Sequence, residues 1–212
     1  MKLESQSFAD GQAIPPEFAF ARPAPEGHVT FAGNRSPHLA WSDVPAETRS
    51  FALVCVDHDA PAVGDDVNRE DRTVPHDTER AEFYHWGIVD LSAELRELPA
   101  GACGEGVVPR GKSDPPGPPG TRQARQDYTS WFEGDEAMEG TYHGYDGPAP
   151  PWNDERVHNY HFTLYALDVE RLPLPEDFHP TDILSEITGH VLAEATLTGT
   201  YTQNVALAEG TG

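Results

Sequence analysis

The amino-acid sequence predicts a mainly β fold, organised as a single domain over residues 1–212. Short apolar or aromatic segments of strand length recur along the chain, and loops rich in glycine, proline or charged residues separate them. Helical periodicity is convincing in only one segment. The chain is long enough to bury most of its apolar surface in one core, and all-β domains often reach this length.

Four segments have the composition of β-strands. Residues 50–57 form a continuous apolar run, which is typical of a strand buried on both faces. The other three combine aromatic, β-branched and threonine side chains, which are enriched in strands. They span residues 83–91, 160–168 and 194–207.

One helix is predicted over residues 181–195. Thr181 is a suitable N-cap, and Asp182 places a negative charge in the first turn. Helical spacing aligns a single apolar stripe that consists of Ile183, Leu184, Ile187, Val191 and Leu192. Residues 92–98 predict a second, short helix.

Two long loops separate the strands. Residues 62–82 are charged and lack an apolar run, and residues 99–127 are dense in glycine and proline. The segments on either side have too few elements to form separate cores, so neither loop is interpreted as a domain linker. Loops of this length in a compact domain are usually functional or mobile.

The chain carries 36 acidic and 14 basic residues, which give a formal net charge of −22 at pH 7. This charge argues against a general nucleic-acid binder, which needs a cationic face, and against docking on anionic lipid. Only two of the basic residues are lysines. At about 1 M salt the screening length falls to about 3 Å, so self-repulsion nearly vanishes. The composition therefore fits a protein of a salty, halophilic cytoplasm, or alternatively an ordinary acidic protein.

Residues 1–18 contain no apolar segment of signal-peptide length, and no later run approaches a membrane span. We therefore expect a cytoplasmic protein without a membrane span. Cys55 lies in an apolar run and Cys103 lies in a glycine-rich loop, without a CxxC pair. Neither a thiolate metal site nor a disulfide is expected.

The sequence lacks the common motifs of nucleotide binding, serine hydrolysis and zinc proteolysis. His158 and His161 are close in the sequence, but side chains three residues apart on a strand point to opposite faces. The two imidazoles are therefore not expected to share a metal ion. We expect no metal and no cofactor.

Three polar clusters lie at strand ends or beside stiff turns, at residues 56–61, 82–86 and 145–160. If they meet, they form a small pocket from Asp57, His85, His158 and free backbone amides of the Gly147 loop. Two imidazoles and turn amides suit a small oxyanion such as phosphate. The carboxylate would orient one imidazole and keep it charged, or would receive a cationic group of the ligand.

Each cluster alone has a simpler structural interpretation. A single histidine in an aromatic strand, such as His85, is typical of a hydrogen-bonded core residue. Asp57 and Asp59 are typical of turns and caps, and residues 147–151 alone indicate only a loop. The occurrence of all three clusters in one chain favours the pocket.

Residues 36–61, 83–91 and 145–168 resemble the phosphatidylethanolamine-binding protein (PEBP) family. They are most similar to its bacterial and archaeal Raf-kinase-inhibitor-like branch, of the YbhB/YbcL type. Residues 189–204 are also similar, so the resemblance covers the chain from Ser36 to Asn204. Three separated motifs in the right order make the resemblance specific.

The resemblance implies a β-sandwich-like fold in which a large, mostly antiparallel sheet packs on a smaller sheet, with a few peripheral helices. It also implies a pocket that accepts phosphate-like groups, including phosphorylethanolamine head groups. Carried over by motif, the ligand-binding residues are Asp57, Asp59, Pro61, His85, Gly147, Pro148, His158 and Tyr160.

The chain departs from the family pattern at two positions. His58 replaces the proline of the usual DPDxP motif, which would alter the pocket rim or add an imidazole nearby. Ala149 replaces the cysteine of the bacterial GPCPP motif, which removes a thiol and leaves the turn. The acidic loop 62–82 is expected to cover or restrict the mouth of the pocket.

Two function classes follow. The resemblance implies a non-catalytic binding protein for a small phosphorylated or carboxylated ligand, which would regulate a partner such as a kinase or protease and would be a monomer or homodimer. The alternative is a small hydrolase or lyase with His158 and His85 as acid and base and Asp57 as the orienting group. No activated nucleophile is evident for that chemistry. A structural relic with an empty site is the third interpretation.

Overall fold

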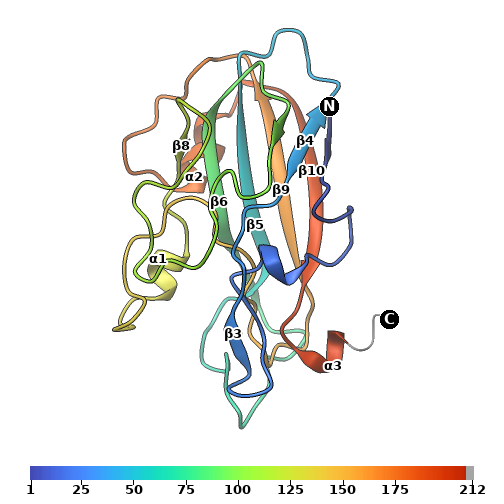
Figure 1. Cartoon of the computed structure of the whole chain (residues 1–212), viewed down its shortest axis with the longest axis vertical. Coiled ribbons are helices and arrows are strands. Elements are labelled where there is room, and N and C mark those ends of the chain that lie inside the picture. Colours follow the sequence, from blue (N-terminus) through green and yellow to red (C-terminus); the bar gives the residue numbers. More distant parts are fainter. Residues whose placement is uncertain (209–212) are drawn as a thin grey trace.

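The computed structural model describes residues 1–208. Its largest element is a five-stranded antiparallel sheet with the order β10–β9–β5–β6–β8. The long strands run along the long axis of the molecule (Figure 1). The members of this sheet are β5 (Ser50–Pro61), β6 (Arg80–Ser92), β8 (Arg122–Gln123), β9 (His158–Leu167) and β10 (Val191–Tyr201).

Two smaller sheets and a few short helices complete the fold. A three-stranded sheet has the order β1–β4–β7 and a two-stranded sheet pairs β2 with β3. These strands are β1 (Lys2–Glu4), β2 (Ala21–Pro23), β3 (Val29–Phe31), β4 (Leu39–Ser42) and β7 (Glu97–Leu98). The helices are the 3-10 turn η1 (Pro16–Phe18), α1 (Tyr128–Trp131), α2 (Pro180–Glu186) and α3 (Val205–Ala208).

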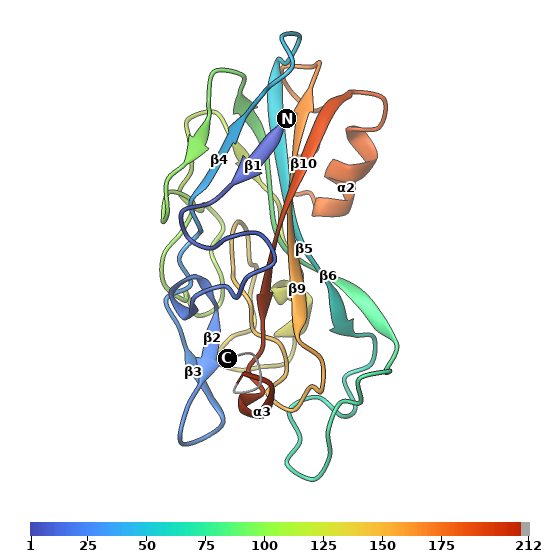
Figure 2. The same ribbon diagram turned by 90° about the vertical axis from the view of Figure 1, so that its right-hand side faces the viewer.

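The large sheet is the middle of three layers. Figure 2 shows the β1–β4–β7 sheet on one side of it and α2 on the other. Trp41 and Phe162 belong to the buried cluster between the two sheets, and Phe178 and Ile183 belong to the cluster beneath α2. The prediction of a mainly β fold with a large antiparallel sheet, a smaller one and few helices is confirmed.

Strand β5 is buried on both faces, as its continuous apolar run predicted. Leu53 and Cys55 face the cluster between the sheets, while Val54 and Val56 face the cluster beneath α2. A strand at the centre of a three-layered arrangement needs apolar side chains in both directions. The run from Phe51 to Val56 therefore contains no polar residue.

A β-bulge in β6 determines the direction of His85. Cys55 pairs with Trp86 and Val56 pairs with Tyr84, so His85 is an additional residue with no opposite partner in β5. Bulges of this kind redirect a side chain. The ring of His85 lies 5.1 Å from that of Tyr160, whereas the Tyr84 ring contacts His179 beside α2.

The predicted helix 181–195 is only partly correct. Helix α2 begins one residue earlier and ends at Glu186, and its N-cap is His179 and not Thr181. The Asp182 carboxylate accepts a hydrogen bond from the His179 amide and closes a capping box. Ile183 and Ile187 are buried as predicted.

The apolar stripe fails beyond the glycine that follows α2. Gly189 has φ +86°, which takes the chain out of the helical conformation. Val191 and Leu192 instead begin β10, where both are partly exposed. The spacing of the apolar residues alone did not predict where the helix ends and β10 begins.

Two further element predictions are corrected. Residues 92–98 form no helix, because Leu98 belongs to β7 and pairs with Leu39 of β4. The last strand ends at Tyr201 and not at residue 207, and the Asn204 side chain then accepts a hydrogen bond from the Ala206 amide at the start of α3.

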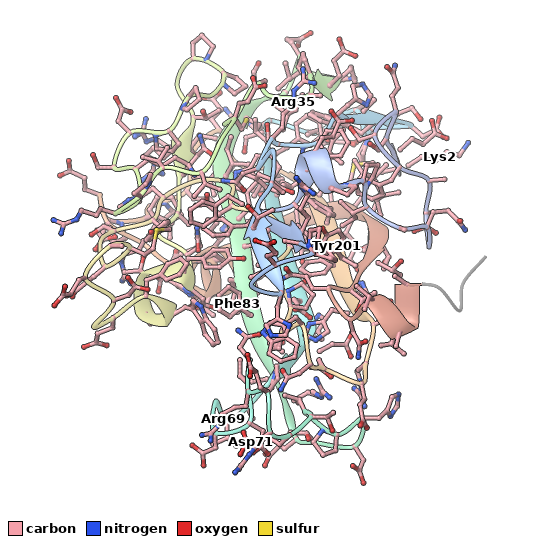
Figure 3. All side chains as sticks on the ribbon, turned by 60° about the horizontal axis from the view of Figure 1, so that its bottom comes forward. Lys2, Arg35, Arg69, Asp71, Phe83 and Tyr201 are labelled. Atoms are coloured by element: carbon pink, nitrogen blue, oxygen red, sulfur yellow. The ribbon has the colours of Figure 1, made fainter. Side chains whose placement is uncertain are left out.

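Strand β6 starts at Arg80, so the charged loop spans residues 62–79. The side chain of Asn153 organises this loop by donating hydrogen bonds to the carbonyl oxygens of Asp66, Arg69 and Arg72. Arg69 and Asp71 lie at the far tip of the loop, away from Phe83 (Figure 3). No helix in the described part of the chain is long and apolar enough to span a membrane.

We predict that Ile183→Ala lowers the free energy of unfolding by about 2–5 kcal/mol, because it leaves a cavity where α2 packs on the sheet. Urea denaturation followed by far-UV circular dichroism measures the change. Val205→Ala is the control, since Val205 is exposed and its truncation should change stability by less than about 0.5 kcal/mol. Equal losses in the two variants would contradict the packing of α2.

Candidate functional site

A pocket lies where β5 ends and where β6 and β9 begin. Its volume is about 120 Å³, several times the roughly 10–15 Å³ that one water molecule requires. Four polar side chains at its wall are buried, namely Asp57, His85, His158 and Tyr160, and Glu82 adds an exposed carboxylate to the lining. Most of the remaining wall is apolar or aromatic, from Ala60, Pro61, Ala81, Phe83, Tyr128, Trp131, Ala149, Pro150 and Pro151.

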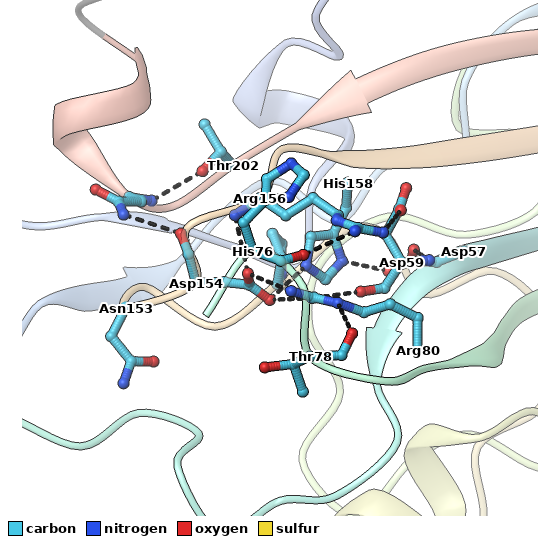
Figure 4. A network of polar contacts seen from close by, with 12 residues as sticks. Asp57, Asp59, His76, Thr78, Arg80, Asn153, Asp154, Arg156, His158 and Thr202 are labelled. Atoms are coloured by element: carbon cyan, nitrogen blue, oxygen red, sulfur yellow. Dashed lines mark hydrogen bonds and ion pairs between the residues drawn. The ribbon is translucent and has the colours of Figure 1, made fainter. Parts of the chain in front are cut away.

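The imidazole of His158 lies between two carboxylates. Its Nδ1 is 2.7 Å from Asp57 Oδ2, and its Nε2 is 3.0 Å from Asp154 Oδ2 (Figure 4). An ionised carboxylate only accepts hydrogen bonds, so both ring nitrogens donate and the ring is an imidazolium. All three side chains are almost completely buried.

Arg80 holds the second carboxylate in place. Its Nη1 is 2.6 Å from Asp154 Oδ2 and its Nη2 is 3.1 Å from Asp154 Oδ1, a bidentate arrangement. The same guanidinium donates to the carbonyl oxygens of Asp59 and Pro75. A buried charge that is paired and fully hydrogen-bonded is tolerated, whereas an unpaired one is costly.

A neighbouring ion pair completes the network. Arg156 donates from Nη1 to Asp59 Oδ1 at 3.1 Å, and Asp59 Oδ2 accepts from the amide and side chain of Asn159. The charges of the three aspartates are then matched by two guanidinium groups and the imidazolium. This network is therefore close to electrically neutral within a chain of net charge −22.

The protonation of His158 follows from its partners. Burial alone would lower its pKa, but hydrogen bonds and charges from Asp154 and Asp57 outweigh burial and raise the pKa to about 9. The ring therefore carries its positive charge at neutral pH.

His85 has the opposite protonation. Its Nδ1 is 2.9 Å from the carbonyl oxygen of Asp146, and because a carbonyl only accepts, Nδ1 carries the hydrogen. Burial lowers the pKa of His85, in spite of the nearby Asp57 charge. The neutral ring leaves Nε2 as a hydrogen-bond acceptor, for which no partner is found among the described residues.

The Tyr160 hydroxyl is fully buried and has no hydrogen-bond partner in the part of the chain that the structure describes. Burial and then the charge of Asp57 raise its pKa, so the hydroxyl stays protonated and can donate. A buried hydroxyl without a partner is rare, because its desolvation is not compensated. At the wall of a pocket, such a group indicates a place for a ligand or water.

Gly147 and Pro148 support the pocket but do not line it. The Gly147 amide donates to Asn34 Oδ1 at 2.8 Å, so the prediction that this amide is free is wrong. A Cβ at this position would collide with the carbonyl oxygen of Phe18, which explains the glycine. The carbonyl of Pro148 accepts from the Phe20 amide.

Five of the eight residues predicted for the site line the pocket, namely Asp57, Pro61, His85, His158 and Tyr160. Asp59 lies in the ion-pair network behind it, and Gly147 and Pro148 lie in the supporting turn. His161 faces away and contacts Thr198, as alternation along the strand predicted. His58 contacts Glu82 and the ring of His161 and is not among the residues that line the pocket, so it adds no imidazole there.

The sequence analysis missed Asp154 and Arg80. Asp154 stands four residues before His158, but strand periodicity gives no reason to join them, because the intervening chain is a turn. Arg80 is one charged residue among many in a loop-like segment. The acidic segment 62–82 was expected at the pocket mouth; its residues Ala81 and Glu82, which belong to β6, line the pocket, whereas residues 62–79 do not.

Candidate reactive groups are few. Among the described residues that line the pocket there is no serine, threonine or cysteine. Burial raises the pKa of Cys55 well above its ordinary value. No group of three or more histidine, cysteine or acidic side chains suited to a metal ion occurs in residues 1–208.

Comparison with known proteins identifies the relatives of this chain. The family model described as phosphatidylethanolamine-binding protein matches residues 4–202. The chain belongs to the PEBP family. The UPF0098 protein YbhB of Escherichia coli is 33% identical over 95% of this chain and 99% of its own length. A UPF0098 protein of Methanothermobacter thermautotrophicus is 31% identical over 95% and 98%.

Solved PEBP structures share the fold. The crystal structure of E. coli YbcL, described as a new member of the mammalian PEBP family, matches with a TM-score of 0.67 and 26% identity over 95% of this chain and 97% of YbcL. A putative PEBP homologue from Chlamydia trachomatis, CT736, matches with a TM-score of 0.61 over 94% and 95%. The resemblance inferred from the three motifs is confirmed.

We predict that the stability of this PEBP member falls with pH through His158. Folding raises the pKa of His158 from 6.5 to about 9. The stabilising contribution is therefore complete below pH 6.5 and is lost as the pH rises through about 9. At about 1.36 kcal/mol per pKa unit, the loss approaches about 3 kcal/mol.

Urea denaturation at a series of pH values between about 6 and 10 measures this loss. His158→Gln lacks the titrating group, so its stability should be lower at pH 6 and should depend less on pH over the same range. The same pH dependence in the wild type and in His158→Gln would contradict the assignment.

Proposed function

We propose that this PEBP member is a non-catalytic protein that binds a small phosphorylated or carboxylated ligand, of the phosphorylethanolamine type, in the pocket beside Tyr160. The observation that carries the proposal is the buried Tyr160 hydroxyl, which has no partner among the described residues. A phosphate or carboxylate oxygen would accept its hydrogen bond and remove the desolvation cost.

The rest of the pocket supports a small head group with an apolar portion. His85 Nε2 accepts a hydrogen bond from a protonated ligand group while its ring is neutral. Aromatic side chains at Phe83, Tyr128 and Trp131 provide apolar contact, and Trp131 is partly exposed at the surface. Pockets with few polar groups in an apolar wall are typical of small-molecule binding.

The hydrolase or lyase alternative has less support. His158 donates both of its nitrogens to carboxylates, so it has no lone pair with which to act as a base. His85 has a free Nε2, but the residues lining the pocket supply no hydroxyl or thiol nucleophile beyond the tyrosines. Binding without catalysis is the simpler function of this arrangement.

Several broader expectations stay predictions. Regulation of a partner enzyme such as a kinase or protease would follow from ligand-dependent contacts around the pocket. A salty cytoplasm as the working environment, a single-domain organisation and a monomeric or homodimeric state also stay predictions. The salty environment is inferred from the net charge, the single domain from the chain length, and the oligomeric state from the resemblance to the family.

We predict that Tyr160→Phe weakens binding of phosphorylethanolamine by about 1–2 kcal/mol, which is roughly tenfold, because one hydrogen bond is lost. Isothermal titration calorimetry in high salt measures the affinity. Tyr165→Phe is the matched control, because Tyr165 packs on the opposite face of β9. Without ligand, Tyr160→Phe should keep the wild-type stability. Unchanged affinity in Tyr160→Phe would contradict the proposal, as would absence of binding to the wild type.

We also predict a pH dependence that arises from His85. Its pKa is lowered, so the ring gains a proton, and a second donor, only when the pH falls below the ordinary histidine range. Sulfate is a suitable probe because its own charge is constant over this range. Sulfate affinity should be nearly constant between about pH 7 and 8 and should rise toward about pH 5. In His85→Gln the rise should be absent, and its persistence there would exclude His85 as the cause.

A further inference from the structure

A second cavity lies apart from the pocket beside Tyr160. It is a groove of about 580 Å³, within the range of roughly 300–1,000 Å³ that is typical of ligand sites. Its walls come from the residues after β1, from η1, from the segment before β4 and from residues 97–100. The described linings of groove and pocket share no residue, and Figure 3 shows Arg35 of the groove well away from Phe83 of the pocket.

We propose that this groove binds a small zwitterion of the α-amino-acid type. The ligand carboxylate lies against Arg35 and His38, and the ligand ammonium group lies against Glu17 and Glu97 at the rim. The inference goes beyond the proposed function, because it concerns another cavity and another ligand.

The imidazole of His38 provides an unpaired donor, which is the first step. Its Nδ1 accepts a hydrogen bond from the Gln6 amide at 3.1 Å, so the ring hydrogen lies on Nε2. Nε2 is buried and has no hydrogen-bond partner among residues 1–208. Glu97 Oε2 is 3.6 Å away, which is too long for a hydrogen bond. Buried polar groups are nearly always paired, so this N–H at the wall of a groove indicates a place for an acceptor.

The guanidinium of Arg35 carries the second step. Nη2 donates to the carbonyl oxygen of Ala100 at 3.2 Å, while Nε and Nη1 have no hydrogen-bond partner in the described part of the chain. Nη1 is 3.9 Å from Glu17 Oε2. A guanidinium has five N–H donors in a geometry that matches a carboxylate. A carboxylate in the groove therefore meets a positive charge with unused donors.

The two glutamates at the rim carry the third step. The side chains of Glu17 and Glu97 are 58% and 61% exposed, and no described residue donates a hydrogen bond to either. Exposed ion pairs contribute little, so both carboxylates can turn from Arg35 and His38 toward a ligand ammonium group at low cost.

The charge of the whole chain favours a zwitterion over a simple anion. The net charge of −22 repels an anion that approaches the groove, and the two rim carboxylates add to that repulsion. A zwitterion has no net charge and brings a cation for the rim. Phe18, Pro99 and Ala100 supply apolar contacts, so an apolar amino acid is a suitable ligand.

The first experiment uses the wild type alone, so it does not depend on the folding of a variant. L-leucine is titrated by isothermal titration calorimetry, together with isocaproate, which lacks the ammonium group, and isoamylamine, which lacks the carboxylate. Leucine should bind at least about tenfold more tightly than either compound, because each of them loses a charge-assisted contact. No binding of leucine, or equal binding of either single-charge compound, would overturn the inference.

The second experiment compares matched variants. Arg35→Gln should weaken leucine binding by about tenfold, and Glu97→Gln by about three- to fivefold, since Glu17 remains at the rim. Arg49→Gln and Glu170→Gln are the controls, because these residues form an exposed ion pair outside the groove and the substitutions change the net charge equally. The same leucine affinity in Arg35→Gln as in Arg49→Gln would contradict the site.

Nuclear magnetic resonance of the histidine rings locates the bound compound. Leucine should shift the ring signals of His38 and leave those of His85 unchanged, whereas phosphorylethanolamine should do the opposite. Leucine shifts at His85 without shifts at His38 would place leucine in the other pocket and overturn the inference. If leucine does not bind while phosphorylethanolamine binds through Tyr160, the inference is wrong and the proposed function stands. If leucine binds at His38 and phosphorylethanolamine does not bind, only the proposed function is wrong.

Discussion

The buried imidazolium of His158 is the interaction on which the pocket depends. It joins the end of β5 through Asp57, the start of β6 through Asp154 and Arg80, and the start of β9 through its own backbone. The backbone pairing of the strands does not by itself form a pocket at this end of the sheet. The paired charges fix their relative positions, because a displaced partner would be left charged in a poorly solvated environment.

A second buried acid has a corresponding role on the other side of the pocket. The Asp146 side chain accepts hydrogen bonds from Asn34, Lys112 and Gln126, and its carbonyl oxygen accepts from His85. Burial raises the pKa of Asp146, and its donors partly offset that effect. Burial keeps His85 neutral, whereas the carboxylates of Asp154 and Asp57 outweigh burial and keep His158 charged, which is how one small pocket contains both a charged and a neutral histidine.

Much of the fold could be predicted from local patterns. The apolar run at residues 50–57 predicted a strand that is buried on both faces, and three motifs indicated the family. The site was less predictable, because Asp154 and Arg80 act through contacts between segments 74 residues apart. The segment after α2 misled the helix prediction, since Val191 continues the apolar period although Gly189 has already ended the helix. The hydrogen bond from the Gly147 amide to the Asn34 side chain joins distant segments, so no local sequence pattern predicts it.

The additional residue in β6 has a consequence for how this chain can tolerate changes in length. Side chains on a strand alternate in direction, so an extra residue reverses the parity of everything that precedes it. Deleting His85 would therefore exchange the two faces for residues 80–84 and would turn Arg80 away from Asp154. The number of residues between Arg80 and the bulge is therefore fixed, because adding or removing one would reverse the direction of the Arg80 side chain. Insertions are better accommodated in the loop that precedes Arg80, where no alternation has to be kept.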